Sequence, residues 1–231
     1  MADRMPVAAN ADERWLHRVG SISAIVIGIS YIAILPLFAR VGVPPAGGEA
    51  WLKYLQGKST IWWAILALCV LTDFLYVPLA LSLYVALQQV STNATRLATA
   101  FVGLFVGLDL AVTWTNYAAL LSLSSSYAAA TNDVQRAGWI AAANYASAVL
   151  GSRTLVFYSI VDLALAIFII GLVMLKENGI FSRTTAYLGV SAGFFGILSA
   201  TGLFVIIMVH ALLVTVWIFF VGYQLFRFSQ R

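Results

Sequence analysis

Charged side chains are scarce in this sequence. Asp, Glu, Lys and Arg make up 10% of its 231 residues, and 62% of the residues are hydrophobic, whereas a soluble globular domain carries roughly 25% charged residues. The apolar residues fall into runs long enough to cross a bilayer, which takes about 20 residues of helix. The composition therefore argues against a soluble fold, and we expect an integral membrane protein with a single membrane domain.

Cysteine and histidine are almost missing, which limits redox and metal chemistry. The one cysteine, Cys69, lies in an apolar run, so no internal disulfide can form. The two histidines, His17 and His210, are predicted to lie at different membrane depths and cannot both bind one haem iron. A five-coordinate haem or pigment on His210 alone stays open.

Common motifs of soluble enzymes and nucleic-acid-binding proteins are also missing. The sequence has no glycine-rich phosphate loop and no His-Glu-x-x-His pair. Its Lys and Arg residues form no basic cluster, so we expect no nucleic-acid partner. The sequence names no cofactor, which stays unknown. The expected partners are the lipid bilayer and either other membrane subunits or further copies of the same chain.

The apolar runs predict an all-α polytopic membrane protein with six transmembrane helices. We place these helices at about residues 18–40, 61–87, 97–123, 154–175, 184–202 and 204–226. Residues 1–17 are expected to form a polar cytoplasmic tail, and residues 18–228 to form the membrane domain. Two connections, about 49–58 and 132–150, are aromatic but too polar to span, so we expect one or two interfacial helices there.

The distribution of positive charge predicts the orientation of the helices. Six spans place both termini on one side of the membrane. The termini and the turns after the second and fourth spans hold eight Lys and Arg residues, and the opposite side holds five. Because cytoplasmic loops carry the excess of Lys and Arg, we expect both termini to be cytoplasmic.

Two stretches resemble a bacterial family of multi-pass membrane proteins that is catalogued only as a domain of unknown function. They are residues 79–87 (LALSLYVAL), and residues 179–183 (GIFSR) leading into 186–190 (AYLGV). The resemblance covers most of residues 15–228. It implies a six-helix architecture in the bacterial inner membrane and supplies no activity, cofactor or catalytic residue.

Four ionisable residues interrupt the apolar runs, and they are the candidate site. Asp73, Asp109, Asp162 and His210 each lie inside a predicted span. A charged Asp at the centre of a membrane helix costs about 2.5–3.5 kcal/mol on insertion scales, so such residues are a default hypothesis of function. We expect the four to face the bundle interior and at least three to share one ligand or water. Their titrations would then be coupled.

The neighbours of these residues fit an inward polar face. The further candidates for ligand or ion binding are Thr113, Asn116, Tyr158 and Tyr76, which lie one to two turns from an aspartate. If a metal is bound, the expected ligands are Asp109, Asp162 and His210. A plainer interpretation is that each Asp is protonated and hydrogen-bonds a hydroxyl across a helix interface.

Three functions follow from these alternatives. The leading hypothesis is a non-enzymatic membrane protein whose buried carboxylates bind a cation, a proton or a small ligand in transport or sensing. The first alternative is an accessory subunit of a larger membrane complex that binds partner helices, lipid or pigment. The second alternative is a metal-dependent intramembrane hydrolase.

Overall fold

The computed structural model describes residues 11–177 and 179–230, and these residues form helices and short connections without any strand. The α-helices are α1 (Ala11–Val41), α2 (Gly48–Leu55), α3 (Ser59–Leu108), α4 (Thr115–Ala128), α5 (Asp133–Leu150), α6 (Arg153–Val156), α7 (Asp162–Met174), α8 (Arg183–Leu198) and α9 (Phe204–Ser229). Two π-helices, η1 (Asp109–Trp114) and η2 (Phe157–Val161), and a 3₁₀-helix, η3 (Ser199–Thr201), complete the chain. The all-α prediction is confirmed for the described residues.

Four helical stretches in the described part of the chain are long and apolar enough to cross a membrane. They are Asp12–Val41, Ser59–Ala128, Arg153–Met174 and Phe204–Ser229. The sequence predicted six. The second stretch contains the predicted second and third helices in one run of 70 residues. The predicted fifth helix forms α8, whose 16 residues fall short of the roughly 20 that a bilayer needs.

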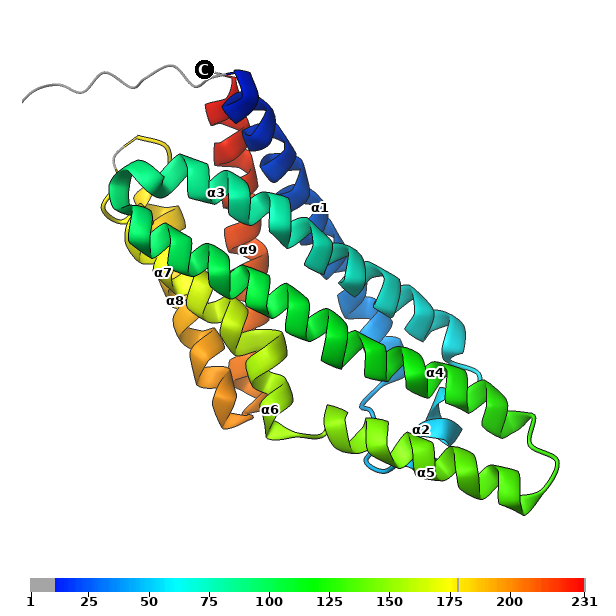
Figure 1. Cartoon of the computed structure of the whole chain (residues 1–231). Coiled ribbons are helices and arrows are strands. Elements are labelled where there is room, and N and C mark those ends of the chain that lie inside the picture. Colours follow the sequence, from blue (N-terminus) through cyan, green and yellow to red (C-terminus); the bar gives the residue numbers. More distant parts are fainter. Residues whose placement is uncertain (1–10, 178, 231) are drawn as a thin grey trace, which may run out of the picture.

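Helix α3 reverses direction at Ser91, whose backbone (φ −158°, ψ 91°) is not helical. Its first limb and the limb that continues into α4 run in opposite directions in Figure 1. The hydroxyls of Thr92 and Thr95 each donate a hydrogen bond of 2.9 Å, to the carbonyl oxygens of Gln88 and Ser91. These bonds satisfy acceptors near the break. The connection between the predicted second and third spans is therefore a corner with a single non-helical residue.

Helix α1 begins at Ala11, so part of the predicted polar tail is helical. His17 lies in this part and is buried, with its Nδ1 atom 3.1 Å from the Ser82 hydroxyl of α3. Packing against α3 extends the helix beyond the apolar run. The rest of the predicted tail, residues 1–10, lies outside the described residues.

Helices α1 and α9 are in close contact at one end of the molecule and diverge toward the other (Figure 1). At the close end the Ser21 hydroxyl donates to the Gly222 carbonyl oxygen at 2.7 Å. A Cβ atom added at Gly28 would lie 2.6 Å from the Phe219 ring. Small residues thus allow the two helices to approach, and the divergence beyond them leaves room between α1 and α9.

Helix α8 packs against α7 and α9 through glycines. A Cβ atom added at Gly193 would lie 2.5 Å from the backbone nitrogen of Phe168, and one at Gly189 would lie 2.7 Å from the indole nitrogen of Trp217. These glycines enclose Ser191 in a Gly-x-Ser-x-Gly sequence, which also occurs at nucleophile elbows. An elbow requires a strand-to-helix turn, and this sequence lies inside α8. Its glycines therefore serve helix packing.

Helices α2 and α5 lie beside α4 at the end where α1 ends and α3 begins (Figure 1). The N–H groups of Gly47 and Gly48 donate to the Ser147 hydroxyl at 3.0 Å and to the Asn144 side-chain oxygen at 2.8 Å. Asn132 caps α5, because its side-chain oxygen accepts from the Gln135 N–H at 2.9 Å. Both segments expected to be interfacial are thus helical, and their place at a membrane surface stays a prediction.

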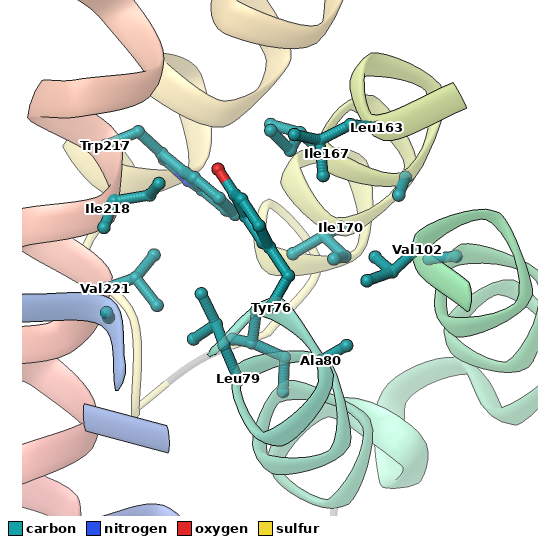
Figure 2. Packing of buried hydrophobic residues seen from close by; sticks show 14 of the residues in the cluster. Tyr76, Leu79, Ala80, Val102, Leu163, Ile167, Ile170, Trp217, Ile218 and Val221 are labelled. Atoms are coloured by element: carbon teal, nitrogen blue, oxygen red, sulfur yellow. The ribbon is translucent and has the colours of Figure 1, made fainter. Parts of the chain in front are cut away.

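The buried apolar residues form two clusters. The first joins α1, α3, α7, α8 and α9, and Figure 2 shows its centre, where Tyr76 lies among Leu163, Ile167 and Trp217. The second joins the end of α1, α2, the start of α3, α4 and α5 around Trp51 and Trp62. The candidate site lies where these two clusters meet.

Candidate functional site

A cavity of about 420 Å³ lies between α1, the first limb of α3, the two π-helices and α9. Its walls combine both core clusters, since Cys69 belongs to the second and Phe105 and Val214 belong to the first. At one side the lining includes Leu35 and Leu212, which are 44% and 55% exposed. The cavity therefore reaches the apolar outer surface where α1 and α9 diverge.

Two of the three predicted aspartates line this cavity. Asp73 comes from the first limb of α3, and Asp109 is the first residue of η1; each is only 3% exposed. The carboxylates are close enough to interact electrostatically. Because α3 folds back at Ser91, two residues far apart in the chain meet on facing limbs of one reversed helix.

The indole of Trp114 lies against both carboxylates. Its Nε1–H donates to Asp73 Oδ2 at 2.8 Å, and the ring is also near enough to interact with Asp109. An N–H bond to an ionised carboxylate is roughly twice as strong as a neutral one. Trp114 therefore partners Asp73 directly and holds the polar wall of the cavity together.

One carboxylate oxygen of Asp109 has no hydrogen-bond partner among the described residues. Its Oδ1 atom is buried and makes no hydrogen bond within the described residues, and the same holds for the Thr113 hydroxyl. Thr113 lies near the Asp109 carboxylate, but the geometry is not that of a hydrogen bond. Both side chains line the cavity. A buried polar group without a partner costs about 1–3 kcal/mol. A ligand that forms hydrogen bonds with these two atoms would offset that cost.

The two π-helices form facing parts of the wall. Asp109, Thr113 and Trp114 all belong to η1, and Ser159 and Ile160 belong to η2. A π-helix bonds residue i to i+5 and occurs often at functional sites. The extra residue per turn brings Trp114 onto the cavity face together with Asp109, from which it is five residues removed. Both π-helices contribute side chains to the cavity lining, which favours a binding site at this position.

His210 lines the cavity from α9 and is buried. Its Nδ1 atom lies 2.9 Å from the Ala192 carbonyl oxygen. A carbonyl oxygen only accepts, so Nδ1 carries the proton and Nε2 is the acceptor of the neutral ring. A Cβ atom added at Gly196 would lie 2.6 Å from this imidazole. The glycine therefore makes the space in which the ring fits.

Aromatic rings complete the wall. Tyr31, Phe105, Trp114 and Tyr117 line the cavity, and Trp114 packs on Tyr117 with ring centroids 5.5 Å apart. Tyr117 in turn stacks on Trp62 at 5.1 Å. The sequence alone predicted no binding role for these rings. The signal was present in the spacing of Trp114 after Asp109, but it needs the π-helix to be recognised.

The other predicted site residues lie elsewhere. Asp162, Tyr158 and Asn116 do not line the cavity. Asn116 instead donates from its side-chain nitrogen to the Val112 carbonyl oxygen of its own helix at 2.7 Å. Tyr76 is buried in the first core cluster, and its hydroxyl lies 2.8 Å from that of Tyr31. The expected four-residue centre is thus reduced to Asp73, Asp109 and His210, with Thr113.

The described residues contain no group of three or more His, Cys, Asp or Glu side chains that suits a metal ion. In particular Asp162 does not join Asp109 and His210 at the cavity. The ligand set expected for a metal-dependent hydrolase is therefore not assembled in this part of the chain.

Comparison with known proteins finds no family model, no characterised protein and no solved structure that matches this chain. The predicted resemblance to a bacterial membrane-protein family stays a prediction.

Proposed function

We propose that this chain is a six-helix protein of the bacterial inner membrane whose central cavity binds a small ligand or cation for transport or sensing, without catalysis. The two limbs of the reversed helix count as two crossings in this proposal. Helix α8 is too short alone but continues directly into η3, and the two together form the sixth crossing. The charge count supports cytoplasmic termini. Four apolar stretches of this length are compatible with such a membrane domain.

The observation that carries the proposal is the Asp109 carboxylate. The side chain of Asp109 lines a cavity of about 420 Å³, and its Oδ1 atom is buried without a hydrogen-bond partner within the described residues. An aspartate with a purely structural role is expected to accept a hydrogen bond from a neighbouring helix, as Asp73 does from Trp114. Asp109 instead lines the cavity with one oxygen left without a donor in the described part of the chain, which favours a ligand over a purely structural role.

The cost of placing these residues in the membrane supports the same conclusion. Each buried Asp costs about 2.5–3.5 kcal/mol on insertion scales, and two share one cavity here. A ligand, a proton or a cation that neutralises the pair offsets this cost. Intramembrane carboxylates that face a cavity commonly mark pathways for substrates, ions or protons.

A thermal-unfolding panel tests the proposal. The purified full-length chain in lipid nanodiscs is heated with sodium, potassium, magnesium and calcium salts, alkyl amines, quinones and fatty acids. A ligand at 100 times its Kd stabilises a protein by about 2.7 kcal/mol. We expect at least one compound to raise the Tm of the wild type and of Asp162→Asn, but not that of Asp109→Asn.

Asp162→Asn is the matched control, because it makes the same chemical change in a helix of the same bundle but outside the cavity. If the wild type and Asp109→Asn respond identically to every compound, the cavity is not the binding site and the proposal fails.

A further inference from the structure

The lining of the cavity also indicates the charge of its ligand. Two carboxylates, Asp73 and Asp109, line the cavity together with His210, and no Lys or Arg among the described residues lines it. Ionised carboxylates only accept hydrogen bonds. The unpartnered Oδ1 atom of Asp109 therefore favours a ligand that donates hydrogen bonds and carries positive charge.

The rest of the lining indicates the size and polarity of the ligand. Apolar and aromatic side chains make most of the wall, among them Phe105, Leu163, Tyr117 and Val214. Aromatic faces attract cations within about 6 Å of the ring centroid. A cavity of about 420 Å³ falls in the range of small-molecule pockets, roughly 300–1,000 Å³. The wall thus suits an apolar body of several carbon atoms beside a charged group.

An inorganic cation fits this lining less well. Calcium takes about 6–8 oxygen ligands, and magnesium needs a near-octahedral set. Of the oxygen-bearing side chains that line the cavity, the hydroxyls of Thr72, Ser159 and Thr215 already bond carbonyl oxygens of their own helices. The two carboxylates are the only charged oxygen ligands that the described residues place in this lining. No group of three acidic, Cys or His side chains suited to a metal forms in the described part of the chain. An organic cation needs only the charge, one or two acceptors and an apolar wall.

We propose that the cavity binds an organic ammonium ion, with its nitrogen at Asp109 and Asp73 and its apolar body against the aromatic wall. This inference rests on the proposed function and specifies its ligand. The side of the cavity at Leu35 and Leu212 opens onto the apolar surface between α1 and α9. In a bilayer that side faces acyl chains, so a membrane-soluble amine reaches the carboxylates without crossing a polar layer.

The test compares three compounds that share one skeleton and differ in charge: phenylbutylamine, phenylbutanol and phenylbutyrate. Their Kd values are measured by calorimetry on the full chain in nanodiscs of zwitterionic lipid, and binding to empty nanodiscs is subtracted. We expect the amine to bind at least about tenfold more tightly than the alcohol, and the carboxylate to bind least, because like charges repel. Ethylamine, which lacks the apolar body, should also bind at least about tenfold more weakly than phenylbutylamine.

Substitutions locate the nitrogen. Asp109→Asn should lower the affinity for phenylbutylamine by about tenfold or more while leaving that for phenylbutanol nearly unchanged. Asp73→Asn should act in the same direction, and it replaces Asp109→Asn if that variant fails to fold. Asp162→Asn should bind all three compounds like the wild type, since Asp162 does not line the cavity.

Each other outcome overturns the inference. Equal or tighter binding of the alcohol or the carboxylate shows a neutral or anionic ligand class and leaves the proposed function intact. An equal loss for amine and alcohol in Asp109→Asn shows a structural effect. If none of the compounds binds the wild type, the ammonium assignment fails, and the broader thermal panel decides the proposed function separately.

Discussion

The bond between Trp114 and Asp73 gives the sharpest prediction about the architecture of the site. The Trp114 Nε1–H donates to Asp73 Oδ2 at 2.8 Å. The substitution Trp114→Phe removes this donor and keeps an aromatic ring. A hydrogen bond to a charged group contributes about 1.5–3 kcal/mol. We expect the double-mutant cycle of Trp114→Phe with Asp73→Asn to show a coupling energy of about 1–3 kcal/mol, measured from unfolding free energies.

Trp217 supplies the control for this cycle. Its Nε1 atom is buried and has no hydrogen-bond partner among the described residues, so Trp217→Phe removes an indole N–H without breaking a bond to Asp73. Trp217→Phe costs packing energy by itself, because the ring is buried. Its cycle with Asp73→Asn should nevertheless give a coupling energy below about 0.5 kcal/mol, as for sites without a shared partner.

The assay is reversible unfolding in mixed micelles, followed by the change in helical circular dichroism. The cycle isolates the pairwise contribution, because packing losses common to the single and double variants cancel. A coupling energy for Trp114 with Asp73 that is no larger than that for Trp217 would refute the reasoning. Asp73 would then have another principal partner, and Trp114 would be a wall residue only.

Two further predictions concern orientation and packing. The orientation is tested with single cysteines in a chain in which Cys69 is replaced by Ala. A cysteine at Val43, which is 90% exposed, should react with an impermeant thiol reagent in intact cells, whereas one at Gln230 should react only after permeabilisation. Labelling at Gln230 in intact cells would reverse the proposed topology. Gly193→Ala should destabilise the protein by about 1–3 kcal/mol, because the added Cβ would meet the α7 backbone. Gly103→Ala, where the added Cβ has open space, should leave the free energy of unfolding unchanged or raise it by up to about 1 kcal/mol. Equal changes in the free energy of unfolding for the two glycine substitutions would contradict this packing.

The aromatic wall also connects the cavity to the helices at the end of the molecule. Trp114 packs on Tyr117, Tyr117 stacks on Trp62, and Trp62 contacts Trp51 of α2. Helix α2 is in turn bonded to α5 through Gly48 and its neighbour. The wall of the cavity is thus fixed from both ends, by the first core cluster on one side and by α2 and α5 on the other.

Composition and hydrophobic periodicity alone determined much of the fold. The apolar runs predicted helices that the structure contains, and the two aromatic connections between them were correctly expected to be helical, as α2 and α5 are. The buried charges were identified for an equally local reason, since an Asp within an apolar run is costly wherever the helix packs. Asp73, Asp109, Thr113 and His210 do line one cavity. Such information is available from sequence because it depends on neighbours within a few turns.

Tertiary structure decided which polar residues meet. Periodicity placed Asn116 on the same face as Asp109, but this assumes regular turns of 3.6 residues. The π-helix η1 adds a residue to its turn, so Trp114 takes the place at the cavity and Asn116 bonds its own backbone. Asp162 follows the second π-helix, η2, and is likewise displaced from the expected face.

The cavity itself depends on contacts between distant segments. It exists because α3 reverses at Ser91 and because α1 and α9 diverge beyond Gly28 and Gly222. Neither feature has a local signal strong enough to fix the angle between helices, since that angle is set by which side chains interlock across the interface. The sequence therefore determined that costly carboxylates lie inside apolar helices, and only the packing of those helices decided that two of them face a shared, open space.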